Sequence, residues 1–364
     1  MLLLLNFFII LSLAEHNPKK VLMVYSGGTI GMKQGQNGWE PETGYLQSLM
    51  QSMPQFQSET LPYYDIIELD PLLDSSAMQP KDWVRMAVVI NEHYNEYDGF
   101  IVLHGTDTLA YTSSILSFMF ENLNKTIVVT GAQTPLCQPY SDATNNLISA
   151  LITAGDIHIP EVVVTFGGLL YRGNRVQKLK ANSYNGFDSA NFPELGMFGA
   201  ETLIDWPHIR SYAREPMKFI PTVTDGVIVI HLHPGISPEF FEQVLTSKVK
   251  GVILAAFGAG NGPDKEAYLK PMREAIQRGV VIVDVTQCHM GSVDLNDYAA
   301  ASGYKNIGII GGGDMTIEAA YTKLTWLLAQ GITPEEVREL MQQNLRGEMT
   351  IMENIKREIN YIIV

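Results

Sequence analysis

The chain has 364 residues, enough for about two domains, and 46% of them are hydrophobic, as in a globular protein with a substantial core. Its formal net charge of −14 and the lack of a basic stripe argue against nucleic acids and anionic membrane surfaces as partners. Its two cysteines, Cys137 and Cys288, are too few for a disulfide framework and lack the spacing of a zinc site, so we expect no metal.

Residues 1–13 form an apolar run that only Asn6 and Ser12 interrupt. The run is too short for a membrane span, which needs roughly 20 apolar residues. Two interpretations of the segment 1–18 stay open. Ser12-Leu13-Ala14 resembles the small-residue pattern of a signal-peptide cleavage site, which would make the protein exported. Alternatively, the segment is a mis-assigned start or a tail outside the folded domains.

The first predicted strand covers Lys20–Val24 and leads into the loop Tyr25-Ser26-Gly27-Gly28-Thr29. Two glycines after a buried strand allow a tight turn and the close approach of a ligand. Thr29 then carries a hydroxyl at the carboxyl end of the strand, where parallel sheets usually bind their ligands. The alternative is a Gly-Gly turn that a threonine happens to follow.

The next predicted strand, Asp65–Leu69, is followed by the polar run Asp74-Ser75-Ser76. Pro80 suits the first position of a helix, and residues 83–94 have the spacing of an amphipathic helix. The polar run therefore lies on a loop after a strand. Ordinary turn chemistry is the alternative explanation for its Asp and Ser residues.

A second strand–loop–helix unit starts with the apolar run Phe100–Leu103. It continues through the loop His104-Gly105-Thr106-Asp107-Thr108 into a helix that reaches Phe120. In a parallel sheet, Thr106 and Asp107 should lie at the same edge as Thr29. For Asp107 the alternative is a helix N-cap.

The remaining elements of the first domain alternate in the same way. Strands are predicted over Thr126–Val129 and Val162–Phe166, with a helix over Asp142–Ala154 between them. The stretch Arg172–Lys178 contains several cations, and a solvated edge is its default interpretation. An amine from this stretch would order the Asp107 carboxylate if it came close.

Residues 205–222 lack periodicity and are rich in Pro, Trp and charge, which indicates a linker. We therefore expect an N-terminal catalytic domain over 19–204, a C-terminal domain over 223–350 and a tail over 351–364. The predicted fold class is α/β, with two α/β domains that have mainly parallel sheets, the N-terminal one larger. The second domain's expected strands are Val227–Ile230, Gly251–Leu254, Val280–Val283 and Ile307–Ile310, and its helices begin near Pro238, Met315 and Pro334.

Other familiar sites are weakly supported. The chain has no P-loop and no GxSxG elbow, and its glycine-rich stretch lacks the spacing of a dinucleotide site. His231 and His233 share one face of a strand, but without further ligands we interpret them as structural histidines rather than metal ligands. Cys288 and His289 are sequence neighbours at a strand end and should point apart.

Several longer motifs stand in a fixed order: Tyr-Ser-Gly-Gly-Thr-Ile-Gly-Met, Leu-Leu-Asp-Ser-Ser, Asp-Gly-Phe-Ile-Val-Leu-His-Gly-Thr-Asp-Thr, Tyr-Arg-Gly-Asn-Arg-Val-Gln-Lys and Asn-Leu-Arg-Gly-Glu. With these motifs the chain resembles the bacterial-type L-asparaginases, most of all their type I branch, over about residues 20–350. The resemblance implies a homotetramer (a dimer of dimers) or a homodimer of two-domain subunits. It also implies hydrolysis of L-asparagine to L-aspartate and ammonia without a cofactor, in the cytoplasm.

The resemblance also assigns roles to residues. Thr29 matches the family's nucleophile, and Thr106, Asp107 and Lys178 match the rest of its catalytic group. Asp74, Ser75 and Ser76, together with Thr106 and Asp107, match the substrate-binding positions. Ala132 falls where the family's backbone lies against the substrate amide.

The chain departs from the family at the lid. Family members often carry a tyrosine about ten residues after the nucleophile, where this chain has Trp39. An indole N–H donates a hydrogen bond but cannot relay a proton as a phenol does. Tyr298 lies in a stretch that supplies a catalytic tyrosine from a neighbouring subunit in other members, and a packed aromatic is the alternative for it.

A second departure concerns allosteric activation. Some type I enzymes have an allosteric asparagine site that uses an arginine, and Ala255 stands at that position. Gln177 also differs from a family threonine, although Thr286, Gln287 and Cys288 match. Without a guanidinium, the site lacks a bidentate partner for an α-carboxylate, and we expect weak or absent activation.

Two alternatives to a specific asparaginase stay open. One is an enzyme that also accepts glutamine, because one methylene changes selectivity by only about 1–3 kcal/mol. The other is a non-catalytic amino-acid-binding protein, since two α/β domains with a cleft also describe such proteins.

Overall fold

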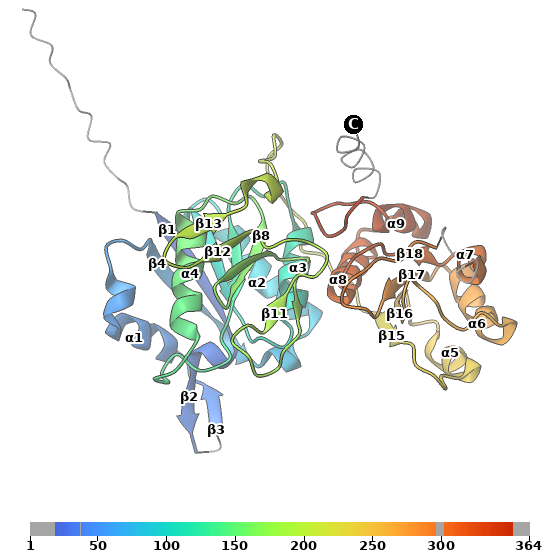
Figure 1. Cartoon of the computed structure of the whole chain (residues 1–364), viewed down its shortest axis with the longest axis horizontal. Coiled ribbons are helices and arrows are strands. Elements are labelled where there is room, and N and C mark those ends of the chain that lie inside the picture. Colours follow the sequence, from blue (N-terminus) through green and yellow to red (C-terminus); the bar gives the residue numbers. More distant parts are fainter. Residues whose placement is uncertain (1–18, 37, 296–301, 352–364) are drawn as a thin grey trace, which may run out of the picture.

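The computed structural model describes residues 19–36, 38–295 and 302–351. Figure 1 shows two α/β domains side by side, a larger N-terminal one and a smaller C-terminal one. The predicted N-terminal segment 1–18 lies outside the described residues, as does the predicted tail beyond Ile351. Within the described ranges, no helix is long and apolar enough to cross a membrane.

In the described chain, the larger domain is built on an eight-stranded sheet with the order β13-β12-β9-β8-β7-β5-β1-β4. The five strands from β8 to β4 are parallel, and the three at the other edge are antiparallel. Its strands are β1 (Lys20–Gly27), β4 (Tyr63–Leu73), β5 (Gly99–Leu103), β7 (Ile127–Thr130), β8 (Val162–Phe166), β9 (Leu169–Arg172), β12 (Gly196–Phe198) and β13 (Thr202–Ile204).

Helices cover both faces of this sheet, as the continuous apolar runs of β1, β5 and β8 require. The helices α2 (Pro80–Glu92) and α3 (Leu109–Met119) pack on the face that contains Leu22 and Phe100. The helices α1 (Tyr45–Ser52) and α4 (Ala143–Gly155) pack on the opposite face. Loops follow the carboxyl ends of the parallel strands.

Short elements carry several of the predicted site residues. They include the 3-10 turns η1 (Thr29–Gly31) and η3 (Ser75–Ala77) and the two-stranded pair of β10 (Gln177–Lys178) with β11 (Phe187–Asp188). The others are β2 (Met32–Gly35), β3 (Gly38–Pro41), β6 (Phe120–Glu121), β14 (Lys218–Phe219), η2 (Pro54–Gln57) and η4 (Trp206–His208).

The smaller domain has a parallel four-stranded sheet within the described residues, in the order β15-β16-β17-β18. Its strands are β15 (Val227–His231), β16 (Gly251–Ala256), β17 (Val281–Thr286) and β18 (Ile310–Gly311). Its helices are α5 (Pro238–Val244), α6 (Glu266–Gln277), α7 (Ser302–Ile307), α8 (Ile317–Leu327) and α9 (Pro334–Met341). This is the predicted fold class, which the structure confirms.

The two domains meet where α3 packs against α8 (Figure 1). Phe118 stacks on Trp326 with 5.9 Å between the ring centroids, and the Thr322 hydroxyl donates to that of Ser114 over 2.8 Å. The residues of α8 belong to the same buried cluster as those of α2 and α3. The predicted linker, 205–222, contains η4 and also β14, which pairs with β6 of the larger domain.

Three predictions from the sequence are wrong. The strand expected over Ile307–Ile310 is mostly absent, because α7 runs to Ile307 and Gly308 turns the chain with a φ of 96° before β18. The N-cap residue of α3 is Thr108, so Asp107 does not cap this helix, and the alternative interpretation of Asp107 is wrong. The cations of the stretch after β8 are not a solvated edge: Arg172 and Arg175 are buried.

Those two arginines are buried because each has a carboxylate partner. Arg172 forms two hydrogen bonds with Glu161, of 2.6 and 3.1 Å, and Arg175 lies 2.9 Å from Asp314 of the other domain. A buried charge needs such a partner, and 139 positions separate Arg175 from its own. Composition alone therefore predicted an exposed stretch where two of the cations are buried.

Candidate active site

The loop that contains Thr29 packs against the loop that contains Thr106. At the end of β1, Gly28 has a φ of 88°, a backbone conformation that side chains rarely adopt. A Cβ atom on Gly28 would lie 2.4 Å from the backbone nitrogen of Gly105, so only glycine permits this approach. Thr29 follows directly, at the start of η1, and is partly buried.

Thr106, Asp107 and Lys178 form one hydrogen-bonded group. The Nζ atom of Lys178 donates to Oγ1 of Thr106 over 2.8 Å and to Oδ1 of Asp107 over 2.7 Å. Lys178 comes from β10, more than 70 positions away in the chain. The Thr106 side chain is buried, whereas the Asp107 side chain is 61% exposed. One ammonium group therefore connects a buried hydroxyl with a solvent-accessible carboxylate.

The polar run after β4 lies beside the same loop. A Cβ atom on Gly105 would lie 2.5 Å from Oγ of Ser75, so the Ser75 hydroxyl is packed against the Gly105 backbone. Thr108 donates to the backbone carbonyl of Ser75 over 2.8 Å, which ties the two loops together. Asp74 accepts a hydrogen bond from the Ser76 amide, so the predicted turn chemistry is also present.

The loop after β7 closes the other side of Thr106. A Cβ atom on Gly131 would lie 2.2 Å from the carbonyl oxygen of His104, and Ala132 is buried. The Thr106 hydroxyl has an acceptor here, Oε1 of Gln133, at 3.4 Å. Gln133 in turn donates to the Ser183 carbonyl over 3.1 Å. We did not predict Gln133 as a site residue, although it stands at a strand end as Thr106 does.

His104 supports the loop from behind and is a second residue that the sequence analysis missed. Its ring is fully buried, with Nδ1 2.6 Å from the carbonyl oxygen of Gly105 and Nε2 2.8 Å from Oγ1 of Thr112. Burial lowers the pKa of His104 to about 4, so the ring is neutral at pH 7. The signal available in the sequence was its place at the end of a buried strand.

Trp39 and Tyr298 are the residues predicted for the lid and for the contribution of a neighbouring subunit. Tyr298 lies outside the described residues, so its role stays a prediction. Trp39 lies on β3, in the hairpin with β2, opposite Gln34, and its side chain is 40% exposed.

Four of the five predicted allosteric residues come together. Gln177, Thr286, Gln287 and Cys288 line a pocket of about 120 Å³. Ala255 does not line it, because its side chain is buried in the core that β16 shares with α8. Its carbonyl oxygen accepts a hydrogen bond from Gln287 over 2.8 Å.

In the ranges that the structure describes, no three His, Cys, Asp or Glu side chains are grouped to hold a metal ion. His231 and His233 are both exposed, and both cysteines are free thiols.

Comparison with known protein families shows which family the chain belongs to. The family model described as "Asparaginase, N-terminal" matches residues 20–210, and the one described as "Glutaminase/Asparaginase C-terminal domain" matches residues 226–341. The chain belongs to the asparaginase family. The resemblance that its motifs indicate is thereby confirmed.

Individual relatives match this asparaginase-family chain over nearly its whole length. It is 42% identical over 339 residues to L-asparaginase 1 of Escherichia coli K12, covering 91% of this chain and 98% of the relative. It is 35% identical over 332 residues to the L-asparaginase of Thermococcus kodakarensis, covering 91% and 99%. The crystal structure of L-asparaginase I from Vibrio cholerae superposes with a TM-score of 0.85 at 41% identity, covering 92% and 100% of the two chains.

Proposed function

We propose that this chain hydrolyses L-asparagine to L-aspartate and ammonia and that Thr29 is the nucleophile. The hydrogen-bonded group of Lys178, Thr106 and Asp107, next to the loop that contains Thr29, is the observation that carries the proposal. A binding protein needs no such group, because a threonine hydroxyl held by an ammonium serves proton transfer rather than recognition. The names of the relatives agree with this substrate.

The first step is attack of the Thr29 hydroxyl on the side-chain amide carbon of asparagine. A threonine hydroxyl is a weak nucleophile and must lose its proton during the attack. Thr106 supplies a path for this proton: its hydroxyl passes a proton to Lys178 over 2.8 Å as the Lys178 ammonium group passes one to the Asp107 carboxylate over 2.7 Å. The amide nitrogen takes up a proton and leaves as ammonia, and an ester joins aspartate to Thr29. Water then attacks the ester and releases L-aspartate.

Backbone amides stabilise the oxyanion that forms in each step. The turns Gly27-Gly28-Thr29 and Gly105-Thr106 pack directly against each other, so their N–H groups lie in one region. Each donor of this kind contributes about 3 kcal/mol to the stabilisation of a transition state. The substrate's α-carboxylate and α-amine bind to Asp74, Ser75, Ser76 and Asp107, and the backbone at Ala132 lies against the amide.

The proposed assembly is a homotetramer, or a homodimer, in which Tyr298 of one subunit reaches the site of another. Light scattering coupled to gel filtration gives the mass of the particle. A monomer that is fully active would contradict the shared site, and Tyr298→Phe tests the phenol itself.

Ammonia release from L-asparagine by the purified chain tests the reaction. We expect Thr29→Ala to lower kcat by about 10³-fold or more, since it removes the nucleophile. We expect Thr106→Val and Lys178→Met to lower kcat by about 100-fold each, the usual contribution of a proton-transfer group. Assays with L-glutamine and D-asparagine in parallel define the substrate range.

Lys180→Met is the matched control. Lys180 is an exposed lysine two residues from Lys178, and its loss should leave kcat within about twofold. Asparagine binding without any ammonia release by the wild type would favour the binding protein instead. Near-normal turnover by Thr29→Ala would refute the assignment of the nucleophile.

A further inference from the structure

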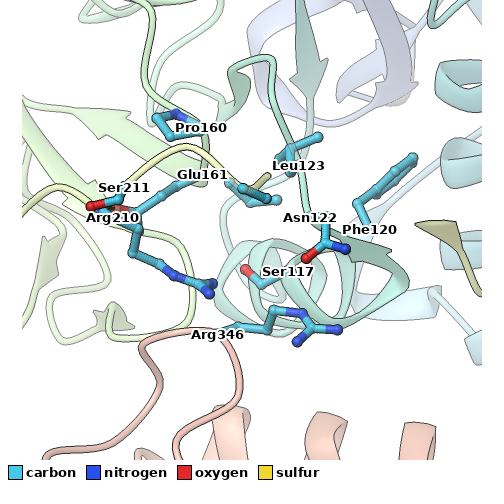
Figure 2. Close-up of a pocket in the computed structure, with 11 residues that line it drawn as sticks. Ser117, Phe120, Asn122, Leu123, Pro160, Glu161, Arg210, Ser211 and Arg346 are labelled. Atoms are coloured by element: carbon cyan, nitrogen blue, oxygen red, sulfur yellow. Dashed lines mark hydrogen bonds between the residues drawn. The ribbon is translucent and has the colours of Figure 1, made fainter. Parts of the chain in front are cut away.

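A second polar pocket lies far from the candidate active site, at the opposite edge of the large sheet. It is formed where β8 begins and α3 ends, whereas the active-site loops follow the carboxyl ends of β1 and β5. Figure 2 shows its lining. Arg210 reaches it from the segment between the domains, and Arg346 from the loop after α9. The pocket thus joins both domains and the segment that connects them.

Positive charge is in excess around this pocket, although the chain as a whole carries −14. Five cations, Arg172, Arg210, Arg346, Lys218 and Lys323, share the three carboxylates Glu161, Glu121 and Glu348. Two positive charges are therefore not balanced there, which is unusual for an acidic protein unless an anion completes the site.

All three carboxylates are already used by other groups, Glu348 by the Lys323 ammonium group over 2.6 Å. Glu161 accepts two hydrogen bonds from Arg172 and a third, of 2.6 Å, from the backbone amide of Arg210. Glu121 is shared between Lys218 and Arg346, each at 3.2 Å. Among the described residues, no carboxylate oxygen lies within ion-pair distance of the Arg210 guanidinium.

Arg346 has donor capacity left over. Its side chain is 12% exposed, and its Nε atom is buried with no hydrogen-bond partner in the described chain. Desolvation lowers the pKa of the Arg210 guanidinium, although the residue as a whole is exposed; Glu161 and Glu348 raise this pKa, and Arg346 and Arg172 lower it. The two guanidinium groups thus repel each other, and a shared anion would relieve the repulsion.

The cations are not explained as caps of α3, whose last turn also lines the pocket. The Leu116 carbonyl accepts from the amide of Phe120, and the Met119 carbonyl accepts from the amide of Ile220 over 2.8 Å. In Figure 2 the Arg210 side chain extends toward Ser117, and Arg346 passes below the same serine. The Ser117 hydroxyl already donates to the Ser113 carbonyl over 2.8 Å, so its oxygen can only accept from a neighbouring guanidinium group.

We propose that this pocket binds a small oxyanion between Arg210 and Arg346. Its volume of about 50 Å³ accommodates one phosphate-sized or carboxylate-sized group and excludes a nucleotide. Planar guanidinium forks match the paired oxygens of such anions. The bound anion would link the two domains through the segment that connects them and raise the stability of the folded chain. This proposal does not depend on the activity of the other site.

Calorimetric titration of the full chain with inorganic phosphate, at fixed ionic strength, tests the proposal. We expect saturable binding of one phosphate per chain and a higher melting temperature in its presence. A parallel titration with acetate shows whether a carboxylate fills the site as well. Arg210→Gln should weaken phosphate binding about tenfold or more, the usual effect of losing a charged hydrogen-bond donor.

Arg214→Gln is the matched control, because Arg214 is exposed, four positions along the chain, and does not line the pocket. It should change the dissociation constant by less than about twofold. If Arg210→Gln fails to fold, Arg210→Lys keeps the charge but loses the fork and should still weaken binding. Equal weakening by the Arg210 and Arg214 variants, or no saturable binding to the wild type, would overturn the proposal.

Discussion

The Nζ atom of Lys323 lies 2.6 Å from Oε1 of Glu348, and neither side chain has any exposed surface. The pair fastens the loop after α9 to α8. Lys323 also donates to the Met341 carbonyl, and Glu348 accepts from the amides of Leu345 and Arg346. Burial alone would raise the pKa of Glu348, but these partners hold it below its usual value. Both charged groups of this buried pair therefore have hydrogen-bond partners in the backbone as well as each other.

We predict that Lys323→Met lowers the free energy of unfolding by about 3–5 kcal/mol, because it leaves a buried carboxylate without its cation. Urea denaturation at pH 7 measures the change. The double variant Lys323→Met/Glu348→Leu should recover a large part of the loss, since it removes both charges together. A single variant within about 1 kcal/mol of the wild type would contradict this.

Asp284 is the opposite case, a buried carboxyl group without any partner. Its side chain is fully buried in β17, and neither oxygen has a hydrogen bond in the described residues. The Tyr304 hydroxyl nearby is also without a partner there. Burial raises the pKa of Asp284 to about 8, from about 3.9 in an unfolded chain.

This pKa shift predicts the direction of a pH dependence. Between pH 4 and 8 the folded chain keeps a proton on Asp284 that the unfolded chain releases. The free energy of unfolding therefore falls as the pH rises, by up to about 1.4 kcal/mol per pH unit, and levels off above about pH 8. Asp284→Asn should remove this dependence, so its stability gain over the wild type should grow from pH 5 to pH 8.

Unfolding of wild type and variant at pH 5, 6.5 and 8 measures the difference. Asp264→Asn, the same change at an exposed aspartate of the same domain, is the control. A constant difference for Asp284→Asn would show that the carboxyl group is ionised throughout.

The sequence predicted most elements because the local signals agree with the fold. β5 and β8 are continuous apolar runs, and α9 begins at Pro334, directly after the N-cap Thr333 of the predicted capping box. The strand expected over Ile307–Ile310 failed because an apolar run of four residues fits a helix end equally well.

The site was partly predictable for a related reason. Thr29, Thr106 and Asp107 stand at strand ends, and parallel strands bring such positions to one edge. Lys178 lies on a short strand whose position depends on contacts more than 70 residues apart, so only the family motif indicated it. Gln133 and His104 each form a single hydrogen bond within or to the Thr106 loop. A hydrogen bond of this kind cannot be predicted from a local sequence pattern.

The predicted allosteric site leads to a kinetic expectation. Ala255 supplies no guanidinium, and its side chain is buried away from the pocket that Gln177 and Thr286 line. We therefore predict a hyperbolic dependence of rate on L-asparagine concentration. Initial rates over a wide concentration range measure the curve, and a clearly sigmoidal one would contradict the prediction.

His104 should affect turnover through the position of the Gly105–Thr106 loop. A carbonyl oxygen can only accept a hydrogen bond, so Nδ1 of the neutral ring carries the proton and donates to the Gly105 carbonyl. Nε2 is then unprotonated and accepts a hydrogen bond from the Thr112 hydroxyl. His104→Ala removes this support and leaves a cavity behind the loop. We predict that kcat falls by about 100-fold while KM changes less, because a small displacement of Thr106 disturbs proton transfer more than binding.

His104→Asn separates positioning from packing, because an amide can still donate near the Gly105 carbonyl. It should recover part of the lost kcat, whereas His104→Ala should not, and melting curves must show that both variants are folded at the assay temperature. The ring is already neutral at pH 7, so His104 should not contribute a titration step near pH 6.5 to the pH profile of kcat. The profiles of the wild type and of His104→Asn should therefore have the same shape in that region. Full turnover by folded His104→Ala would mean that the loop keeps its position without the imidazole.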